Sequence, residues 1–408
     1  MGVSVKIVII NSSCKTSSTG KIAYGLYRRL AEAGNDCILA YGNNEEYPDE
    51  PGLIRITNQR EIVFHNRISY ITGYEGRYSR KATKRLITIL EDFKPDIVQL
   101  YNLHGFYLNS FELLDYLKKR NIPTVYSMLD EYPYLGSCCY AFTCDRFRMS
   151  CRGCRKELSQ YPRSLYRRTG KQVNRLKKNI YKGFDKLIFV GPEWVKRRAL
   201  ESSLLQDKQV EVVDEFIDTD SCFYPRETKE LRNKLGISEE QIVILDVAPS
   251  HDERKGVKYF IELAERVTDK KYIFINVGFS GNNTDGLPDN FIPVSFVSDQ
   301  NELAEYYSLA DLFICTSMAD TMPNVCLDSL ACGTPVVGFR ITGIPYVAGE
   351  PLGRFVEPEN VAELVRLVME TGKKDADIVE KAREYALERY SPEVYVEKMS
   401  KIYESALL

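Results

Sequence analysis

Residues 311–339 read DLFICTSMADTMPNVCLDSLACGTPVVGF, and this stretch decides the fold. Its apolar start at 311–315 predicts a β-strand, its middle at 324–331 a helix and its end at 335–339 a second strand. Pro323 stands at the expected helix start, where proline is favoured. A helix between two such strands forms a βαβ unit, and strands that are apolar throughout indicate a parallel sheet covered on both faces.

The same alternation of strands and helices extends outward from this stretch. Further strands are predicted at 5–10, 37–41, 53–57, 96–100, 124–127, 186–190, 241–247, 271–277 and 291–296, and helices at 22–31, 256–267 and 301–310. The pattern starts again after residue 222. We therefore predict an α/β fold with two doubly wound, Rossmann-like domains, at 1–222 and 223–389.

Length, charge and the start of the chain exclude several classes of protein. At roughly 150 residues per domain, the 408 residues suffice for about two to three domains. The net charge of −2 provides no overall field for nucleic acid, and no apolar run reaches the roughly 18 residues of a membrane span. The first residues predict neither a secretory signal nor myristoylation, so we expect a cytoplasmic protein.

The segment 320–328 has the features of a phosphate and sugar site. The first N–H groups of the helix at 324–331 have no partner within the helix, so they can hold a phosphate. Asn324 and Asp328 share one face of that helix, which lets Asp328 accept hydrogen bonds from a ribose near the phosphate. Asp320 lies in a loop at the carboxyl end of a strand, where open α/β sheets bind ligands. Each carboxylate taken alone is also explained as a solvated acid.

A second charged segment, 252–256, follows the strand at 241–247 and opens a helix. A cation at Lys255 would neutralise charge that develops on a departing phosphate. Taken alone, Lys255 is equally explained by an ordinary charged helix start.

Together these segments resemble the family 4 glycosyltransferases, which have the GT-B fold. Asp320 and Asp328 have the spacing of that family's acid-x7-acid motif, and 330–337 follows as in the family. Lys255 matches its phosphate-binding lysine. Three more segments resemble family motifs: the glycine loop at 18–24 with Gly20, the segment 95–104 with the active-site histidine at His104, and the closing helix at 390–408.

The resemblance implies a retaining transferase that uses a nucleotide sugar and no catalytic metal. It implies that the two domains face each other across a cleft and that the closing helix crosses back to the first domain. The leaving diphosphate would act as the base. The implied catalytic residues are His104, Lys255 and Asp320, and the implied donor-binding residues are Gly20, Arg254, Lys255, Asn324, Val325 and Asp328.

Several positions depart from the family pattern. The family usually has Glu where this chain has Asp320 and Asp328, and the shorter Asp328 must lie nearer the ribose or act through water. The arginine expected before the lysine is absent at Pro249 and Ser250. Leu129 replaces a histidine. An Asn-Gly pair is usual where this chain has 215–216. These changes bear on donor affinity and on the rate of transfer.

Five of the 11 cysteines lie between 138 and 154. Four of them, with a C-x-x-C pair at the end, have the residue types of a structural zinc site; free thiols are the main alternative and an iron–sulfur cluster is a third. The candidate ligands are Cys138, Cys144, Cys151 and Cys154, with Cys139 as a spare.

The segment 146–182 is strongly basic and contains aromatic residues. It has thirteen Lys or Arg and one acid, Glu157. Such a surface fits an anionic membrane that carries a lipid-linked acceptor. Single-stranded RNA is a rival partner, and a merely solvated helix is the simplest alternative.

We predict a glycosyltransferase that moves a sugar from a UDP- or GDP-sugar to a saccharide, lipid-linked by expectation, in bacterial capsule or exopolysaccharide synthesis. An epimerase of sugar nucleotides with the GT-B fold and a nucleic-acid-binding protein built on 146–182 are the alternatives. No G-x-G-x-x-G follows the first strand of either domain, which argues against a Rossmann dehydrogenase, and the segment at Gly20-Lys21 lacks the features of a P-loop.

Overall fold

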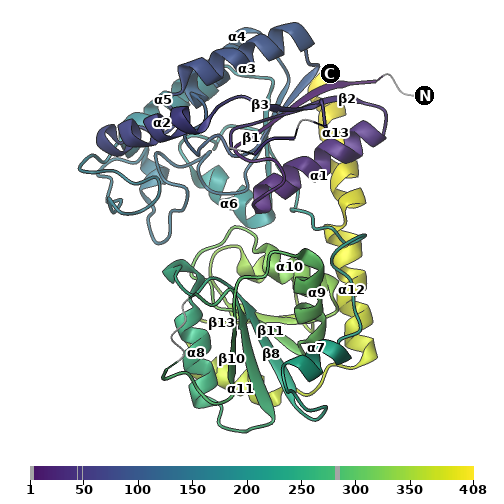
Figure 1. The fold of residues 1–408 in the computed structure, drawn as a ribbon. Helices are drawn as coiled ribbons and strands as arrows, with labels where there is room; N and C mark the ends of the chain where they lie inside the picture. Colours follow the sequence, from purple (N-terminus) through teal and green to yellow (C-terminus); the bar gives the residue numbers. More distant parts are fainter. Residues whose placement is uncertain (1–3, 44, 48, 281–284) are drawn as a thin grey trace. The chain divides into compact units, whose positions relative to one another are not determined.

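The computed structural model describes residues 4–43, 45–47, 49–280 and 285–408. Its chain divides into two compact units (Figure 1). The first runs to Glu215 and also includes Tyr395–Leu408, and the second is Phe216–Val394. The sequence placed the corresponding boundaries at residues 222 and 390.

The first unit is built on a parallel sheet of seven strands, in the order β3-β2-β1-β4-β5-β6-β7. The strands are β1 (Lys6–Asn11), β2 (Asp36–Tyr41), β3 (Leu53–Arg55), β4 (Ile97–Leu100), β5 (Thr124–Ser127), β6 (Leu187–Gly191) and β7 (Val210–Val212). The helices are α1 (Ser18–Glu32), α2 (Gln59–Thr72), α3 (Arg80–Phe93), α4 (Ser110–Lys119), α5 (Gly170–Tyr181), α6 (Glu193–Glu201) and the 3₁₀ helix η1 (Arg146–Met149). Strands β1 and β4 are neighbours, and the strand order reverses between them.

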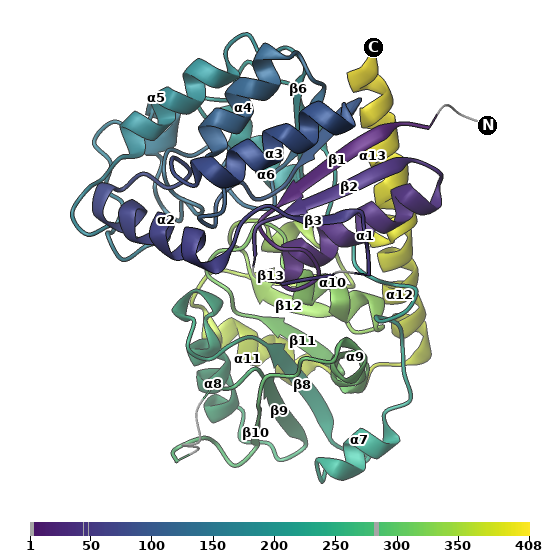
Figure 2. The same cartoon turned by 45° about the horizontal axis from the view of Figure 1, so that its top comes forward.

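Helices cover both faces of this sheet. Helices α3, α4 and α5 pack side by side over one face, and α1 lies on the other (Figure 2). The central strands β1, β4, β5 and β6 are almost wholly buried, and both of their faces are correspondingly apolar.

The second unit is a parallel sheet of six strands, in the order β10-β9-β8-β11-β12-β13. The strands are β8 (Ile242–Val247), β9 (Tyr272–Val277), β10 (Phe291–Val294), β11 (Leu312–Cys315), β12 (Val336–Phe339) and β13 (Gly353–Val356). The helices are α7 (Lys229–Lys234), α8 (Val257–Arg266), α9 (Gln300–Leu309), α10 (Asn324–Ala331), α11 (Val361–Glu370), α12 (Ala376–Tyr390), η2 (Glu253–Lys255) and η3 (Ile344–Tyr346). Helices α9, α10 and α12 share one hydrophobic core, and α8 and α11 share the core on the other face.

The last helix, α13 (Pro392–Leu407), belongs to the first unit from Tyr395 onward. The hydroxyl groups of Tyr395 and Tyr101 are hydrogen-bonded at 2.8 Å, and the Tyr403 hydroxyl donates to Gln99 Oε1 at 3.0 Å. These buried bonds attach the carboxyl end of the chain to β4.

The predicted α/β class with two doubly wound sheets is confirmed, and the helix over 324–331 has the predicted bounds. The predicted strands all occur within a few residues of their expected positions. The sequence did not predict the strands β7 and β13, nor the helices α7, α11 and α12 of the second unit. Both strands lie at sheet edges and are only three and four residues long, so their hydrophobic pattern is too short to detect.

Candidate functional site

Helix α10 begins at the carboxyl end of β11 and leaves its first N–H groups free of a side-chain cap. Pro323 is the residue before the helix and provides no capping side chain. The Asn324 Oδ1 atom is buried and has no hydrogen-bond partner among the described residues. Val325 is half-buried beside it. Such a helix start, with aligned N–H groups and the positive end of the helix dipole, favours an anion.

Lys255 and Asp320 meet next to this helix start. The Lys255 Nζ atom lies 2.7 Å from Asp320 Oδ2, and Arg254 Nη1 lies 3.5 Å from the same oxygen. Both side chains of the closer pair are mostly buried. A carboxylate therefore faces two cations at the end of adjacent strands β8 and β11.

Gly256 allows the lysine segment to lie against β11. It has a φ of 70°, and a Cβ atom at this position would lie 2.1 Å from the Thr316 carbonyl oxygen. The backbone of Arg254 also accepts a hydrogen bond from the Met318 N–H group at 2.8 Å. These contacts require glycine at 256 and hold Lys255 near Asp320.

Asp328 lies one turn further along α10. It is 8% exposed, and its charge is one of the causes that raise the pKa values of Tyr307 and Cys332 after their own burial. The structure thus puts a buried acid, Asp328, on the same helix as Asn324. The contact of Asp328 with a ribose stays a prediction.

Gly20 occupies the first turn of α1 in the first unit. The Gly20 N–H group donates to the Ser17 hydroxyl at 3.2 Å, and a Cβ atom at 20 would lie 2.7 Å from the Cys14 carbonyl oxygen. The glycine is therefore needed for packing against Cys14, and its approach to a donor stays a prediction.

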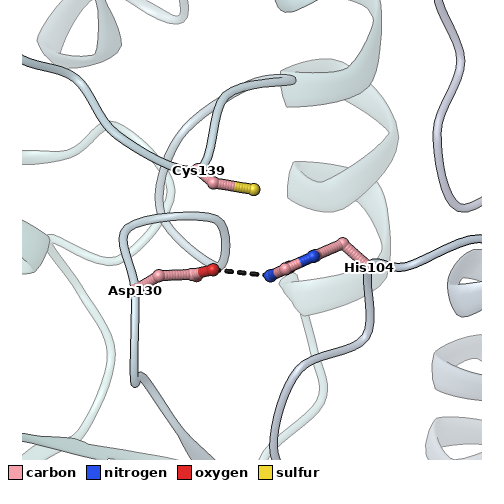
Figure 3. Close-up of side chains that lie close together, drawn as sticks. All are labelled: His104, Asp130 and Cys139. Atoms are coloured by element: carbon pink, nitrogen blue, oxygen red, sulfur yellow. Dashed lines mark hydrogen bonds and ion pairs between the residues drawn. The ribbon is translucent and has the colours of Figure 1, made fainter. Parts of the chain in front are cut away.

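His104 stands after β4 and is paired with Asp130, which stands after the neighbouring strand β5. The two are joined by a hydrogen bond of 2.6 Å between His104 Nε2 and Asp130 Oδ2, and Cys139 lies beside them (Figure 3). The Tyr161 hydroxyl is 3.2 Å from His104 Nδ1. Burial opposes a charge on His104, but the Cys139 sulfur and the Asp130 carboxylate outweigh it, so the pKa of His104 lies well above its usual value.

A buried glutamate supports the histidine loop. Glu75 accepts hydrogen bonds from the N–H groups of Gly105 at 2.9 Å and Phe106 at 3.3 Å. Burial raises the pKa of Glu75. This acid fixes the backbone next to His104.

Sequence reasoning missed Asp130, Cys139, Tyr161 and Glu75 as parts of this cluster. One signal was present for Asp130: it follows a predicted strand, as His104 does. The carboxyl ends of parallel neighbours meet at one edge of a sheet. The other three come from loops and carry no such signal.

The four predicted zinc ligands lie close enough for their charges to interact, since Cys151 and Cys154 act on Cys138, and Cys144 and Cys154 act on Cys151. Cys151 is buried, Cys138 and Cys154 are half-buried, and Cys144 is exposed. Burial is the main cause that raises the pKa of Cys138 to about 12 and that of Cys151 to about 11, and neighbouring cysteines raise both further. Within the described residues, no three of these sulfur atoms lie within 4.8 Å of one another. Zinc at this cluster stays a prediction.

The basic segment differs from a uniformly solvated helix. Lys156 and Lys177 are buried, and each donates to backbone carbonyl groups. Lys177 binds the carbonyl oxygens of Leu135 and Gly136 at 3.1 and 3.0 Å, and burial lowers its pKa to about 8. Most of the other basic side chains are exposed.

An exposed apolar surface lies beside the basic segment. We call it the α2 surface, and it consists of Val63, Phe64, Tyr70, Ile71, Leu165 and Tyr166. The Leu165 N–H group donates to the Tyr70 carbonyl at 2.7 Å, so the end of α2 and the loop at 161–168 are joined. None of the helices in the described part of the chain combines the length and apolar character that crossing a membrane requires.

Two family models match the chain in succession. The model "Glycosyltransferase Family 4" matches residues 19–221, and "Glycosyl transferases group 1" matches residues 227–387.

Curated relatives share modest sequence identity with this chain. N-acetyl-alpha-D-glucosaminyl L-malate synthase of Bacillus anthracis is 25% identical over 49% of this chain and 55% of that protein. The putative colanic acid biosynthesis glycosyl transferase WcaC of Escherichia coli is 21% identical over 69% of this chain and 68% of its own. The match spans about half the length of the first such relatives.

Solved structures share the fold over nearly the full length. Sucrose-phosphate synthase from Thermosynechococcus elongatus has a TM-score of 0.70 at 16% identity, with 98% of each chain covered. A HepE protein of Anabaena in complex with UDP and glucose has a TM-score of 0.66 at 13% identity, covering 98% of this chain and 100% of that chain.

Proposed function

We propose that this chain, which belongs to the glycosyltransferases of GT-B fold and family 4 type, moves a sugar from a nucleotide-sugar donor to a saccharide acceptor. The observation that carries the proposal is the Lys255–Asp320 pair, 2.7 Å apart, in the unit that contains the uncapped start of α10. The Anabaena HepE structure in complex with UDP and glucose supports a UDP-sugar as donor.

Each group in the second unit has a distinct role in the proposal. The first N–H groups of α10 and the Lys255 ammonium group stabilise the charge that develops on the leaving diphosphate. Asp320 accepts hydrogen bonds from the sugar, and Asp328 from the ribose. The leaving phosphate takes the proton of the acceptor hydroxyl, and the sugar keeps its anomeric configuration.

A donor panel with a matched lysine pair tests this role. Thermal unfolding is measured with UDP-, GDP-, CMP- and dTDP-sugars, and transfer is measured with the donor that stabilises. Lys255→Ala should reduce transfer at least tenfold, which corresponds to about 1.4 kcal/mol of barrier. Lys258→Ala, at an exposed position three residues on in the same unit, is the control. Unchanged transfer by Lys255→Ala, or no stabilisation by any donor, would refute the assignment.

For the acceptor, we propose a lipid-linked saccharide reached from an anionic membrane surface. The α2 surface exposes 61% of Phe64 and 57% of Tyr166. The basic side chains around it are Arg60, Arg67, Arg163 and Arg167, all exposed. Apolar side chains that enter the interface and cations that contact anionic lipid are the features of an interfacial membrane site.

A cavity beside this surface supports the same acceptor class. It has a volume of about 570 Å³, and its charged lining consists of Arg60, Arg77, Arg80, Lys81 and one acid, Glu61, which is paired with Arg85. Among the residues that the structure describes, Arg60, Arg80 and Lys81 make no ion pair. A phosphate-bearing lipid headgroup has the matching charge. The name of WcaC, which refers to colanic acid biosynthesis, supports a role in bacterial surface polysaccharide synthesis.

Vesicle sedimentation tests the membrane proposal. The protein should bind vesicles that contain phosphatidylglycerol and not vesicles of phosphatidylcholine alone. The double variant Arg163→Glu, Arg167→Glu should lose more than tenfold in binding, because each cation near an anionic surface contributes about 1 kcal/mol. Phe296→Ser, at an exposed apolar residue of the second unit, should bind normally. Binding to single-stranded RNA in place of vesicles would contradict the proposal.

A further inference from the structure

Three donor groups of different chemistry converge in the first unit. They are the imidazole of His104, the carboxylate of Asp130 and the sulfur of Cys139, and their ligand atoms all lie within 4.8 Å of one another. The three residues come from separate segments, and in Figure 3 the side chains of Asp130 and His104 point toward each other with the Cys139 sulfur beside them. In the described part of the chain they are the only such group.

We propose that His104 Nε2, an Asp130 carboxylate oxygen and Cys139 Sγ form a binding site for one divalent cation of the zinc type. A nitrogen, an oxygen and a sulfur donor are the three ligand types that Zn²⁺ takes in proteins. Ligand bonds of about 2.0–2.3 Å in a tetrahedron place neighbouring ligand atoms roughly 3.3–3.6 Å apart. The Nε2–Oδ2 distance of 2.6 Å therefore has to open by less than 1 Å.

The surroundings already orient two of the ligands. The Tyr161 hydroxyl contacts His104 Nδ1 at 3.2 Å, which leaves Nε2 to face the cation. The Tyr132 N–H group donates to Asp130 Oδ1 at 2.9 Å, which leaves Oδ2 for the cation. Partners of this kind fix metal ligands in characterised sites. Asp130 and Cys139 are 6% and 1% exposed, so the cation would be largely removed from solvent.

Binding of the divalent cation conserves charge, because it releases protons from the ligands. The sulfur–metal bond forms as the S–H bond of Cys139 breaks, and the proton that His104 and Asp130 share leaves with it. The protons pass to the buffer. One carboxylate and one thiolate then neutralise the divalent cation, and water completes the fourth position.

The cation would bind to His104 Nε2, the nitrogen atom that faces Asp130 in this structure. Because the family resemblance implies a catalytic role for His104 in the proposed sugar transfer, bound zinc should inhibit transfer reversibly. This consequence rests on the proposed function, whereas cation binding itself does not.

Titration of the purified full chain with Co²⁺ tests the site without an activity assay. We expect one equivalent to bind, with visible bands and a near-ultraviolet thiolate-to-cobalt band, and Zn²⁺ to displace it. Cys139→Ser should remove the thiolate band and weaken binding at least tenfold. Cys144→Ser is the matched control in the same loop region, because Cys144 lies outside the group. Asp130→Asn serves as a second variant if Cys139→Ser fails to fold.

Each outcome decides the proposal. Loss of binding in Cys139→Ser or Asp130→Asn, with binding kept in Cys144→Ser, supports it. No binding of Co²⁺ or Zn²⁺ by the wild type would overturn it. Binding that is lost in Cys144→Ser and kept in Cys139→Ser would also overturn it, because the metal would then sit at the cysteine cluster. If the wild type binds one cation but no nucleotide sugar stabilises it against thermal unfolding, the result contradicts only the proposed function.

Discussion

Lys255 donates a hydrogen bond to Asp320 over 2.7 Å, and the two residues stand after adjacent strands of one sheet. The cation that the proposed function assigns to the diphosphate is therefore already paired with an acid of the same chain. An arriving phosphate must compete with the Asp320 carboxylate for Lys255. This competition makes the two steps of donor recognition, phosphate binding and sugar binding, separable by mutation.

Asp320→Asn should strengthen the binding of UDP several-fold and reduce sugar transfer. The amide removes the negative charge that competes for Lys255, but it also weakens the contact with the sugar hydroxyl groups. Isothermal titration with UDP and with the UDP-sugar measures the two effects. Asp269→Asn is the control, because that carboxylate pairs with Lys271 at 3.4 Å, in the same unit but outside the candidate site. Weaker UDP binding by Asp320→Asn would show that Asp320 does not compete with the phosphate.

Gly256→Ala should destabilise the second unit and weaken donor binding, whereas Gly236→Ala should only destabilise it. Both glycines have nearly the same backbone angle, with φ of 70° and 69°. Each alanine therefore costs about 1 kcal/mol for the left-handed conformation. Only at 256 does the new Cβ atom approach a backbone oxygen, at 2.1 Å, and that contact must displace Lys255.

The measurement for this pair is the urea midpoint of unfolding together with UDP affinity. Equal losses of stability in the two variants, with donor affinity retained in Gly256→Ala, would contradict the role of Gly256 in positioning Lys255.

Much of the fold follows from local pattern. The unit β11–α10–β12 is predicted because apolar strands, a proline at the helix start and a glycine after the helix agree with one another. Strand β13 and helix α12 were missed. The strand is short, and Ala382 and Ala386 of α12 are buried by contacts with elements far away in the sequence.

The candidate site is predictable only in part. Lys255, Asp320 and Asn324 follow strands, so their common location follows from the topology of a parallel sheet. The cluster at His104 depends on Cys139 and Tyr161, which reach it through an irregular loop. A loop has no period from which a contact could be inferred, so only the approach of Asp130 to His104, both of which follow neighbouring strands, has a signal in the sequence.

A buried acid in β8 should make the stability of the second unit depend on pH. Burial raises the pKa of Asp246 to about 7, against the effects of a hydrogen bond from Asn276 and the charge of Lys255. The Asn276 Nδ2 atom donates to Asp246 Oδ2 at 2.7 Å. The usual pKa of the group is 3.8, so the unfolded chain ionises Asp246 well before the folded chain does.

The direction of the pH dependence follows from the higher pKa of Asp246 in the folded chain. Below about pH 4 both states hold the proton, and the stabilising contribution of the protonated acid is complete. Between about pH 4 and pH 7 the folded state binds more protons than the unfolded state, so stability falls by up to about 1.4 kcal/mol per pH unit. Asp246→Asn should abolish this part of the fall, because the amide oxygen can still accept the bond from Asn276 and carries no proton to lose.

Urea unfolding at pH 5 and pH 8 measures the difference. We expect the loss of stability between the two pH values to be smaller in Asp246→Asn than in the wild type. Asp289→Asn, at an exposed acid of the same unit, should behave as the wild type does. An equal loss in Asp246→Asn and the wild type would show that Asp246 is ionised in the folded protein throughout this range, which would require a closer cation than the structure provides.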